Sequence, residues 1–285
     1  MESEHIVRTA AVHWDIRRGE VQSNLDTAVE LLESAASDDT KLAVLPEMWG
    51  SSFMGDDADS VTEEVARAEK TIQTLSGDHQ MVVTGTNYEF SKHGKLFNRA
   101  TLYDNGKLIG EYRKIHLFSP MGEDRYFDHG SEALIVETSV GRVGVAICYD
   151  LRFPELTRYL FLSEAQILLL PSQWPEPRAA HWRLLARSRA IENQWFFVGA
   201  NRSGIEASLV NGQQIHFPGN SIIVDPTGEV LAEGDGEAGV IIGDLDLKQT
   251  AVVRRAIPVS KDRHEDVYTN LWSRRWTGHP IGGMK

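Results

Sequence analysis

Apolar residues recur along the chain with two spacings, and these predict an alternation of strands and helices. Short apolar or alternating runs are typical of strands, and they occur at residues 9–14, 42–45, 81–88, 98–103, 108–112, 143–149, 166–170, 195–200, 221–224, 229–232 and 239–245. Helical spacing predicts one helix that starts at a Ser23-x-x-Asp26 signal, others over residues 62–75 and 178–194, and a fourth that opens at Pro154.

This order of elements predicts the fold class. Strands that alternate with helices, with a hairpin turn at residues 104–106, indicate sheets covered by helices, so we expect an α/β or layered α+β sandwich. No Pro/Ser/Gly linker or low-complexity run divides the chain, and we therefore expect a single domain although 285 residues could accommodate nearly two.

Composition and charge narrow the function. The net charge of −12 argues against a nucleic-acid binder, which needs a basic face. One cysteine permits neither an intrachain disulfide nor a thiolate zinc cluster, and no apolar run approaches the length of a membrane-spanning helix. The first residues do not resemble a signal peptide. We expect a cytoplasmic protein that binds no nucleic acid and no membrane.

The only thiol, Cys148, lies next to the end of a predicted strand, just before a turn into a helix. A lone cysteine on an apolar strand is by default a small buried hydrophobic residue. At such a turn, however, helix N-terminal amides lower the pKa of a thiol, and free backbone amides can bind an oxyanion. Cys148 is therefore a candidate nucleophile.

Glu47 and Lys114 also lie at or just past the ends of predicted strands. Taken singly, each is by default a solvated surface charge. Layered α/β folds collect functional groups at that edge of the sheet, so the two side chains and Cys148 are predicted to meet in one pocket.

Three segments then indicate a family. Residues 45–47 (LPE), 112–118 (YRKIHLF) and 144–155 (GVAICYDLRFPE) resemble the three signature stretches of the nitrilase superfamily of carbon-nitrogen hydrolases, and the resemblance extends to about residue 268. It implies a four-layer α-β-β-α sandwich, a single hydrolase domain over residues 1–268, no cofactor and no metal. It also implies a homodimer or higher homo-oligomer. Residues 269–285 have no counterpart in this resemblance, and we expect them to form a tail at a subunit contact or an active-site mouth.

The same resemblance assigns catalytic roles. The Glu-Lys-Cys triad of the superfamily corresponds to Glu47 as general base, Lys114 as oxyanion stabiliser and Cys148 as nucleophile. A second glutamate corresponds to Glu123, which would orient Lys114, with Asp124 as a neighbouring alternative. The backbone amide of Tyr149 would be a second oxyanion donor.

Residues 172–175 (SQWP), followed by Arg178 and His181, look most like the ω-amidase branch, whose members hydrolyse the terminal amide of 2-oxoglutaramate and 2-oxosuccinamate. A substrate of this kind carries a carboxylate, so the pocket should offer a cation. Arg152 and Arg178 are candidates, although each is equally plausible as a structural ion-pair partner. Phe118 and Trp174 would line the pocket, although an aromatic residue by default belongs to the hydrophobic core.

Several alternatives stay open at this stage. An N-carbamoyl amide hydrolase, a deaminated-glutathione amidase and a nitrilase would share the triad, and a non-catalytic scaffold would share the fold. A Cys-His dyad with His116 is a further possibility, against its default as a structural histidine. The G-x-G-x-x-G at residues 234–239 joins two predicted strands and is better explained as a hairpin turn than as a nucleotide site.

Overall fold

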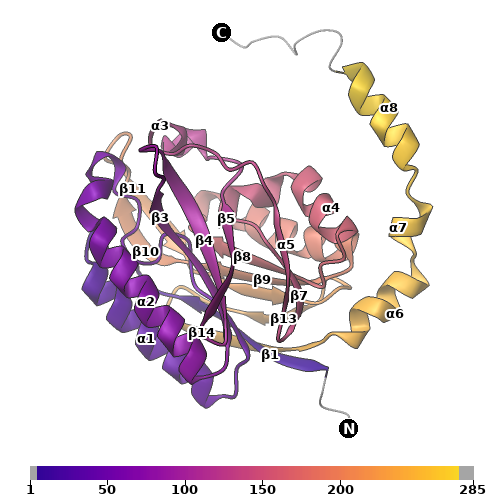
Figure 1. Cartoon of the computed structure of the whole chain (residues 1–285), viewed down its shortest axis with the longest axis horizontal. Helices are drawn as coiled ribbons and strands as arrows, with labels where there is room; N and C mark the ends of the chain where they lie inside the picture. Colours follow the sequence, from indigo (N-terminus) through magenta and orange to yellow (C-terminus); the bar gives the residue numbers. More distant parts are fainter. Residues whose placement is uncertain (1–4, 276–285) are drawn as a thin grey trace.

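The computed structural model describes residues 5–275 and contains two six-stranded sheets that face each other (Figure 1). The first sheet has the order β14-β1-β2-β3-β4-β5, and its strands are β1 (Ile6–His13), β2 (Leu42–Val44), β3 (Val82–Phe90), β4 (Leu96–Asp104), β5 (Lys107–Arg113) and β14 (Gly239–Asp246). The second sheet has the order β13-β12-β9-β8-β7-β6, and its strands are β6 (Leu134–Thr138), β7 (Gly141–Val145), β8 (Ile167–Ser172), β9 (Phe196–Asn201), β12 (Ile222–Val224) and β13 (Val230–Glu233).

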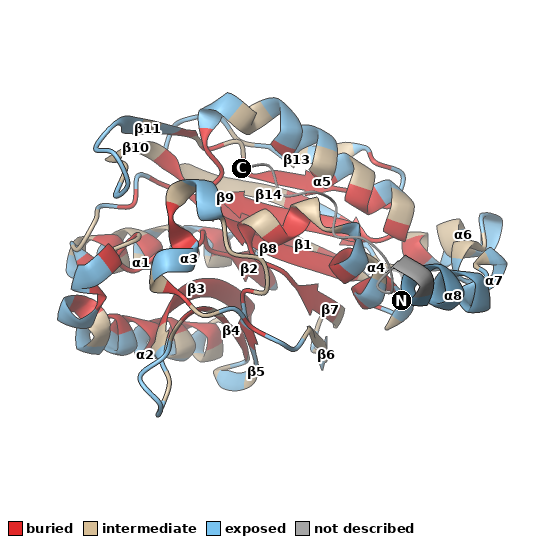
Figure 2. Cartoon of the chain, turned by 90° about the horizontal axis from the view of Figure 1, so that it is seen from above, coloured by how far each residue is buried: buried red, intermediate tan, exposed pale blue. Residues whose placement is uncertain are grey.

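Each sheet has a parallel centre. Strands β1, β2 and β3 run parallel in the first sheet, and β7, β8 and β9 run parallel in the second, whereas the outer strands of both sheets pair antiparallel. The central strands are almost entirely buried (Figure 2) because both of their faces are covered. The carboxyl ends of parallel strands lie at one edge of a sheet, and this arrangement positions the site described below.

Helices cover the outer face of each sheet and complete four layers. Helices α1 (Val21–Ser37) and α2 (Thr62–Asp78) pack on the first sheet, and α4 (Pro154–Leu162) and α5 (Ala179–Asn193) pack on the second. Alternation along β1 explains the two cores: Ala10 and Val12 face the helices, whereas Ala11 faces the other sheet. The predicted α-β-β-α sandwich is confirmed.

The predicted elements occur with small shifts. The hairpin between β4 and β5 turns at Asn105 and Gly106, whose φ values of +48° and +78° are those of a type I′ turn. The helix expected to start at Ser23 begins instead at Val21, without a side-chain cap, so the Ser-x-x-Asp signal was wrong. The strand expected to reach residue 149 ends at Val145, because the chain turns into a short 3-10 helix at Cys148.

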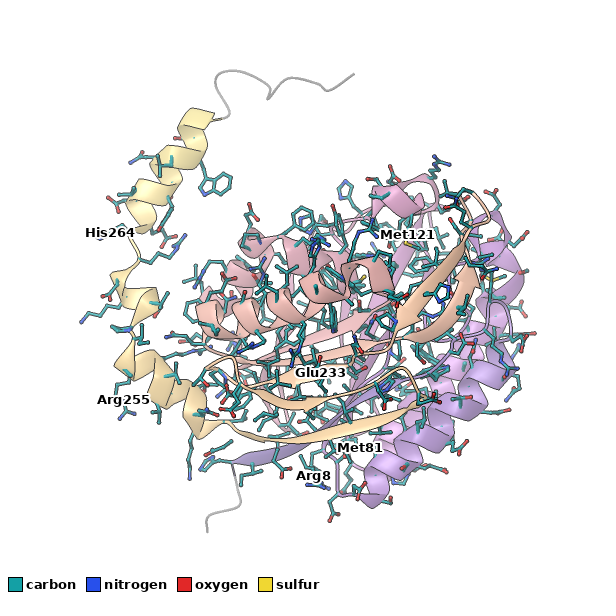
Figure 3. All side chains as sticks on the ribbon, turned by 180° about the vertical axis from the view of Figure 1, so that it is seen from behind. Arg8, Met81, Met121, Glu233, Arg255 and His264 are labelled. Carbon is teal, nitrogen blue, oxygen red and sulfur yellow. The ribbon has the colours of Figure 1, made fainter. Side chains whose placement is uncertain are left out.

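Some elements had no clear sequence signal. Besides β6, these are the hairpin strands β10 (Ser203–Ala207) and β11 (Gln214–Pro218), and the short helix α3 (Glu123–Tyr126). Beyond β14, helices α6 (Lys248–Ala256), α7 (Val259–Asp262) and α8 (Glu265–Arg275) form an arm that leaves the body (Figures 1 and 3). Residues 276–285, which make up most of the predicted tail, lie outside the described residues. Within residues 5–275, no helix combines the length and the apolar character that crossing a membrane requires.

Gly130 fixes the end of β5, the strand that leads to Lys114. Its backbone N–H donates to the Lys114 carbonyl at 2.8 Å, and a Cβ at this position would lie 2.0 Å from the Arg113 carbonyl oxygen. No side-chain movement relieves a clash with backbone, so the main chain passes here only because residue 130 is glycine.

We therefore expect Gly130→Ala to lower the free energy of unfolding by about 1–3 kcal/mol, as overpacking does. Gly239→Ala is the matched control, because a Cβ at Gly239 meets no atom within 4 Å. Urea titrations of the two variants and the wild type measure the effect. Equal stability of both variants would contradict the proposed constraint.

Candidate active site

Three strand ends and one short helix bring four chemical groups together. Glu47 follows β2, Lys114 follows β5, Cys148 follows β7, and Glu123 is the first residue of α3. All four line one cavity between the two sheets. The prediction that the three strand ends meet is therefore confirmed as geometry.

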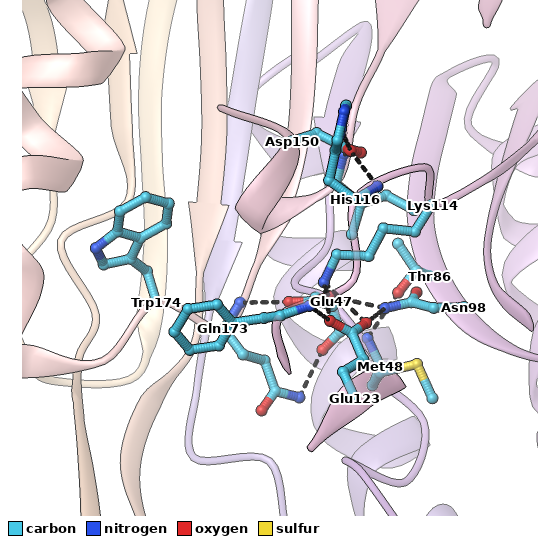
Figure 4. Close-up of polar contacts among 12 residues, drawn as sticks. Glu47, Met48, Thr86, Asn98, Lys114, His116, Glu123, Asp150, Gln173 and Trp174 are labelled. Carbon is cyan, nitrogen blue, oxygen red and sulfur yellow. Dashed lines mark hydrogen bonds and ion pairs between the residues drawn. The ribbon is translucent and has the colours of Figure 1, made fainter. Parts of the chain in front are cut away.

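Lys114 is at the centre of this group (Figure 4). Its Nζ lies 2.8 Å from Glu47 Oε1 and 2.8 and 2.7 Å from the two carboxylate oxygens of Glu123, so its three protons are all donated to carboxylates. The side chains of Lys114 and Glu47 are each only 1% exposed. Burial alone would lower the pKa of Lys114, but the charges of Glu123 and Glu47 outweigh it and raise this pKa above its ordinary value.

Glu123, rather than Asp124, belongs to the cluster. Glu123 is buried, whereas Asp124 is exposed. The Glu123 carboxylate also accepts the backbone N–H of Phe118 at 2.7 Å, which holds it toward Lys114. Burial raises the pKa of Glu123, and the positive charge of Lys114 offsets only part of this effect.

Cys148 is buried and has a φ of +42°, in the left-handed region that a non-glycine residue rarely adopts. Such strain is found where a nucleophile is held on a sharp turn after a strand. Burial, together with the negative charge of Glu47, raises the pKa of the thiol well above its ordinary value of 9.0, and Lys114 offsets only part of this. The expected lowering by helix amides was wrong, because the following turn is a short 3-10 helix and desolvation dominates.

Two further residues hold the cluster, and neither was among the predicted site residues. Asn98, on β4, donates from Nδ2 to Glu47 Oε1 at 2.8 Å and to Glu123 Oε1 at 3.2 Å, so it bridges the two carboxylates. Gln173 donates its backbone N–H to Glu47 Oε2 at 3.0 Å and its Nε2–H to the Glu47 carbonyl at 2.8 Å. For Asn98, the only hint of such a role was its polar side chain within a predicted strand.

A second, smaller cavity also opens at Cys148. It is lined by all five residues predicted to bind substrate, namely Phe118, Tyr149, Arg152, Trp174 and Arg178. The guanidinium of Arg152 lies over the Trp174 ring, 4.7 Å from its centroid, and that of Arg178 lies 5.3 Å from the centroid of Phe118. The structure thus places the predicted residues on one side of the thiol.

Comparison with known proteins then decides the family. The carbon-nitrogen hydrolase family model matches residues 8–255, which include all four residues of the cluster. The chain belongs to the carbon-nitrogen hydrolase family.

The relatives of this hydrolase span nearly its whole length. A 2-oxoglutaramate amidase of Bacillus subtilis is 34% identical over 261 residues, covering 91% of this chain and 98% of the relative. The omega-amidase NIT3 of Saccharomyces cerevisiae is 32% identical, covering 93% and 96%. The crystal structure of a carbon-nitrogen hydrolase from Helicobacter pylori superimposes with a TM-score of 0.87 at 27% identity, covering 94% and 98%.

His116 does not face the thiol in this hydrolase. Its Nδ1 lies 2.7 Å from Asp150 Oδ1, and its ring stacks on Phe153 with centroids 3.6 Å apart. Asp150 also accepts the Ile147 N–H at 2.9 Å and the Tyr112 hydroxyl at 2.7 Å. Asp150 thus ties the turn of Cys148 to the segment of Lys114, and the geometry favours the structural interpretation of His116 over a Cys-His dyad.

The structure gives no group of three or more potential metal ligands of the His, Cys, Asp or Glu type among residues 5–275. The buried carboxylates are instead occupied by Lys114, Asn98 and backbone amides.

The raised pKa of Cys148 predicts a pH dependence of stability. Below about pH 9 the thiol is protonated in both the folded and the unfolded chain. Above this pH the unfolded thiol ionises while the folded one stays neutral, so the unfolded state binds fewer protons and the free energy of unfolding falls. The loss from this group amounts to about 1 kcal/mol between pH 9 and 10.

Cys148→Ser removes this contribution. We expect the free energy of unfolding of the wild type to fall more steeply than that of the variant from pH 9 to 10, in urea titrations at fixed ionic strength. Tyrosines such as Tyr88 and Tyr112 contribute mainly above pH 10 and are common to both proteins. Parallel curves would show that the thiol is not buried in the neutral form.

Proposed function

We propose that this carbon-nitrogen hydrolase is an ω-amidase, which hydrolyses the terminal amide of a short carboxylate-bearing substrate such as 2-oxoglutaramate or 2-oxosuccinamate. One observation carries the proposal: two guanidinium groups that have no carboxylate partner among residues 5–275 line a cavity together with the candidate nucleophile. Relatives named 2-oxoglutaramate amidase and omega-amidase, similar over most of their length, support the same substrates.

Arg152 and Arg178 are the two arginines that line the smaller cavity at Cys148. Neither lies within ion-pairing distance of a carboxylate in the described residues, and Arg152 lies 3.2 Å from Nδ1 of His181 instead. Burial lowers the pKa of Arg152, and the like charge of Arg178 adds to this. An anion between the two guanidinium groups would relieve that repulsion and satisfy their donors, which is what a substrate carboxylate offers.

The first chemical step follows from the charges of the cluster. Glu47 takes the proton of the Cys148 thiol as Sγ attacks the amide carbon, because the raised pKa of the thiol makes a base necessary. The oxygen that becomes negative is stabilised by the positive charge of Lys114 and by the backbone N–H of Tyr149, and losing such a donor costs about 3 kcal/mol of barrier. Glu47 then returns the proton to nitrogen, and ammonia leaves.

The second step regenerates the enzyme. Glu47 deprotonates a water molecule, whose oxygen attacks the thioester carbon, and the carbon–sulfur bond breaks to give the carboxylic acid and the free thiol. Glu123 acts by orienting Lys114, since both of its oxygens accept from Nζ. A catalytic thiol must stay reduced, which supports a cytoplasmic location.

The arginine pair separates the proposal from most of its alternatives. A simple nitrile or a neutral N-carbamoyl amine offers no anion to the two guanidinium groups. A scaffold would have no need for a strained, buried thiol beside a base. Deaminated glutathione carries carboxylates and is longer, so it remains the alternative that an assay must separate.

We expect kcat/KM for 2-oxoglutaramate to fall about 30- to 100-fold in Arg152→Met and in Arg178→Met, the cost of a lost charge-assisted hydrogen bond. Turnover of butyramide, which has no carboxylate, should change far less. Arg183→Met is the control, because Arg183 is exposed and paired with Glu233.

Ammonia release across 2-oxoglutaramate, 2-oxosuccinamate, an N-carbamoyl amine, deaminated glutathione and an aliphatic nitrile measures the substrate class. Turnover of only the carbamoyl compound or only the nitrile would contradict the proposal.

We also propose that residues up to about 268 form one hydrolase domain that assembles with a second copy through its α4 and α5 face and the arm. Leu184 and Ile191, seven residues apart on α5, are both exposed on one side of that helix, and Tyr159 and Leu162 are exposed on α4. A groove between α4 and the arm is lined in part by Tyr159 and by Trp272 of α8. Exposed apolar faces of this kind are typical of subunit contacts.

Light scattering during size-exclusion chromatography tests this assembly. We expect a multiple of 31.9 kDa for the wild type and a shift toward 31.9 kDa for Leu184→Glu. Leu108→Glu, an exposed leucine on β5 of the opposite sheet, should keep the wild-type mass. A monomeric wild type at micromolar concentration would overturn the proposal.

A further inference from the structure

The two cavities that meet at Cys148 differ in chemistry. Both are lined by Phe118, Cys148 and Gln173. The larger cavity also contains the two carboxylates and Lys114, whereas the smaller one contains the arginine pair. A substrate bound at the thiol therefore has a carboxylate-lined space on one side and a guanidinium-lined space on the other.

The proposed function, on which this inference rests, gives the substrate a direction. The acyl chain extends toward Arg152 and Arg178, so the amide nitrogen faces the two carboxylates, of which Glu47 supplies its proton. The nitrogen of a primary amide needs little more room than ammonia. The cavity nevertheless continues beyond the carboxylates, and its empty space, counted together with the part that is open to solvent, amounts to about 570 Å³.

The walls of this additional space are mainly apolar. Phe53, Met121, Tyr126, Leu209 and Ile215 line it. The turn between β10 and β11 packs here close to the segments that flank Glu123. A Cβ placed at Gly55 would lie 3.4 Å from both Leu209 Cδ1 and Tyr126 Cζ, so these three segments meet at one point. Side chains from three separate segments thus converge on a hollow that opens toward the amide nitrogen.

The charges at its far side are already paired. Arg18 donates to Glu206 at 2.6 Å and to the Ala207 carbonyl at 2.8 Å. Glu206 also pairs with the fully buried Arg202 at 3.2 Å, and Arg202 donates to Gln173 Oε1 at 3.1 Å. Arg18 and Arg202 are thus both engaged by Glu206, and within residues 5–275 the Nε–H of Arg18 is the only buried donor of these two guanidinium groups that has no acceptor. Apart from this single donor, the walls suit an uncharged, apolar group.

We propose that this cavity is a subsite for an apolar substituent on the leaving nitrogen, and that the enzyme also hydrolyses N-alkyl and N-arylalkyl monoamides of short dicarboxylic acids. The Cys148 Sγ–C bond forms as the C–N bond breaks, and the nitrogen takes its proton from Glu47 and leaves as a primary amine. Water then cleaves the thioester, so the overall reaction consumes one water and yields the dicarboxylate and the amine.

A homologous series of substrates tests the subsite. The unsubstituted monoamide of glutarate is compared with its N-methyl, N-propyl and N-benzyl derivatives, and the released ammonia or amine is quantified by mass spectrometry. We expect kcat/KM to rise from N-methyl to N-propyl by roughly 15-fold, as each of the two added methylenes contributes about a fourfold gain when buried. Hydrolysis of the unsubstituted compound alone would overturn the subsite and leave the proposed function intact. Hydrolysis of none of the four would overturn both.

Substitutions at the wall locate the effect. Leu209 is partly exposed on a turn, so Leu209→Trp should fold and reduce the ratio of N-benzyl to unsubstituted kcat/KM at least tenfold, whereas Leu209→Ala should raise it. Leu231→Trp, at a similarly exposed leucine on β13 outside this cavity, is the matched control and should keep the wild-type ratio. A ratio that Leu209→Trp does not change would overturn the assignment of this cavity to the leaving group.

Discussion

One ammonium group held between two buried carboxylates is the interaction on which this site depends. Removing three charges from water is costly, and it is tolerable here because every Nζ proton of Lys114 is donated to Glu47 or Glu123. The cluster keeps one net negative charge. Burial and the negative charge of Glu47 together raise the pKa of the Cys148 thiol, so its proton must pass to Glu47 rather than to solvent.

The main role of the two sheets is to hold these charged side chains at fixed positions. The parallel strands β2 and β7 place Glu47 and Cys148 at the same edge of the two facing sheets. Strand β5, which pairs antiparallel with β4, places Lys114 beside them. Neutral donors then complete the coordination: Asn98 bridges the carboxylates, and Gln173 binds both the side chain and the backbone of Glu47. Each of these contacts joins segments far apart in the sequence, so the site exists only when the whole sandwich is formed.

Much of this could be predicted because short apolar runs mark buried strands, and because functional groups after such runs meet at the strand ends. The positions of Glu47, Lys114 and Cys148 follow from that rule, and the two sheets follow from the order of the elements. The role of Asn98 did not, since no local pattern shows which strand residue will face a carboxylate 51 positions away. The raised pKa of Cys148 also depends on burial by distant segments.

The arm of α6–α8 and the β10–β11 hairpin were missed for a related reason. These segments are short and rich in polar residues, so the sequence did not distinguish them from loops and their form depends on tertiary packing. The hairpin nevertheless supplies Glu206 and Leu209 to the wall of the larger cavity. The catalytic groups of a site can thus be predicted from the sequence, whereas the shape of its cavity depends on elements that have only a weak sequence signal.

Trapping the acyl-enzyme is the most direct test that Glu47 takes the proton of Cys148 beside Lys114. Excess glutarate monoamide is mixed with enzyme, quenched with acid within milliseconds, and the mass of the peptide containing Cys148 is measured for the wild type and for Glu47→Gln. We predict a transient glutaryl thioester in the wild type and a rate of formation at least a hundredfold slower in Glu47→Gln. A thioester that forms equally fast in both proteins, or an acyl group on another residue, would contradict the account.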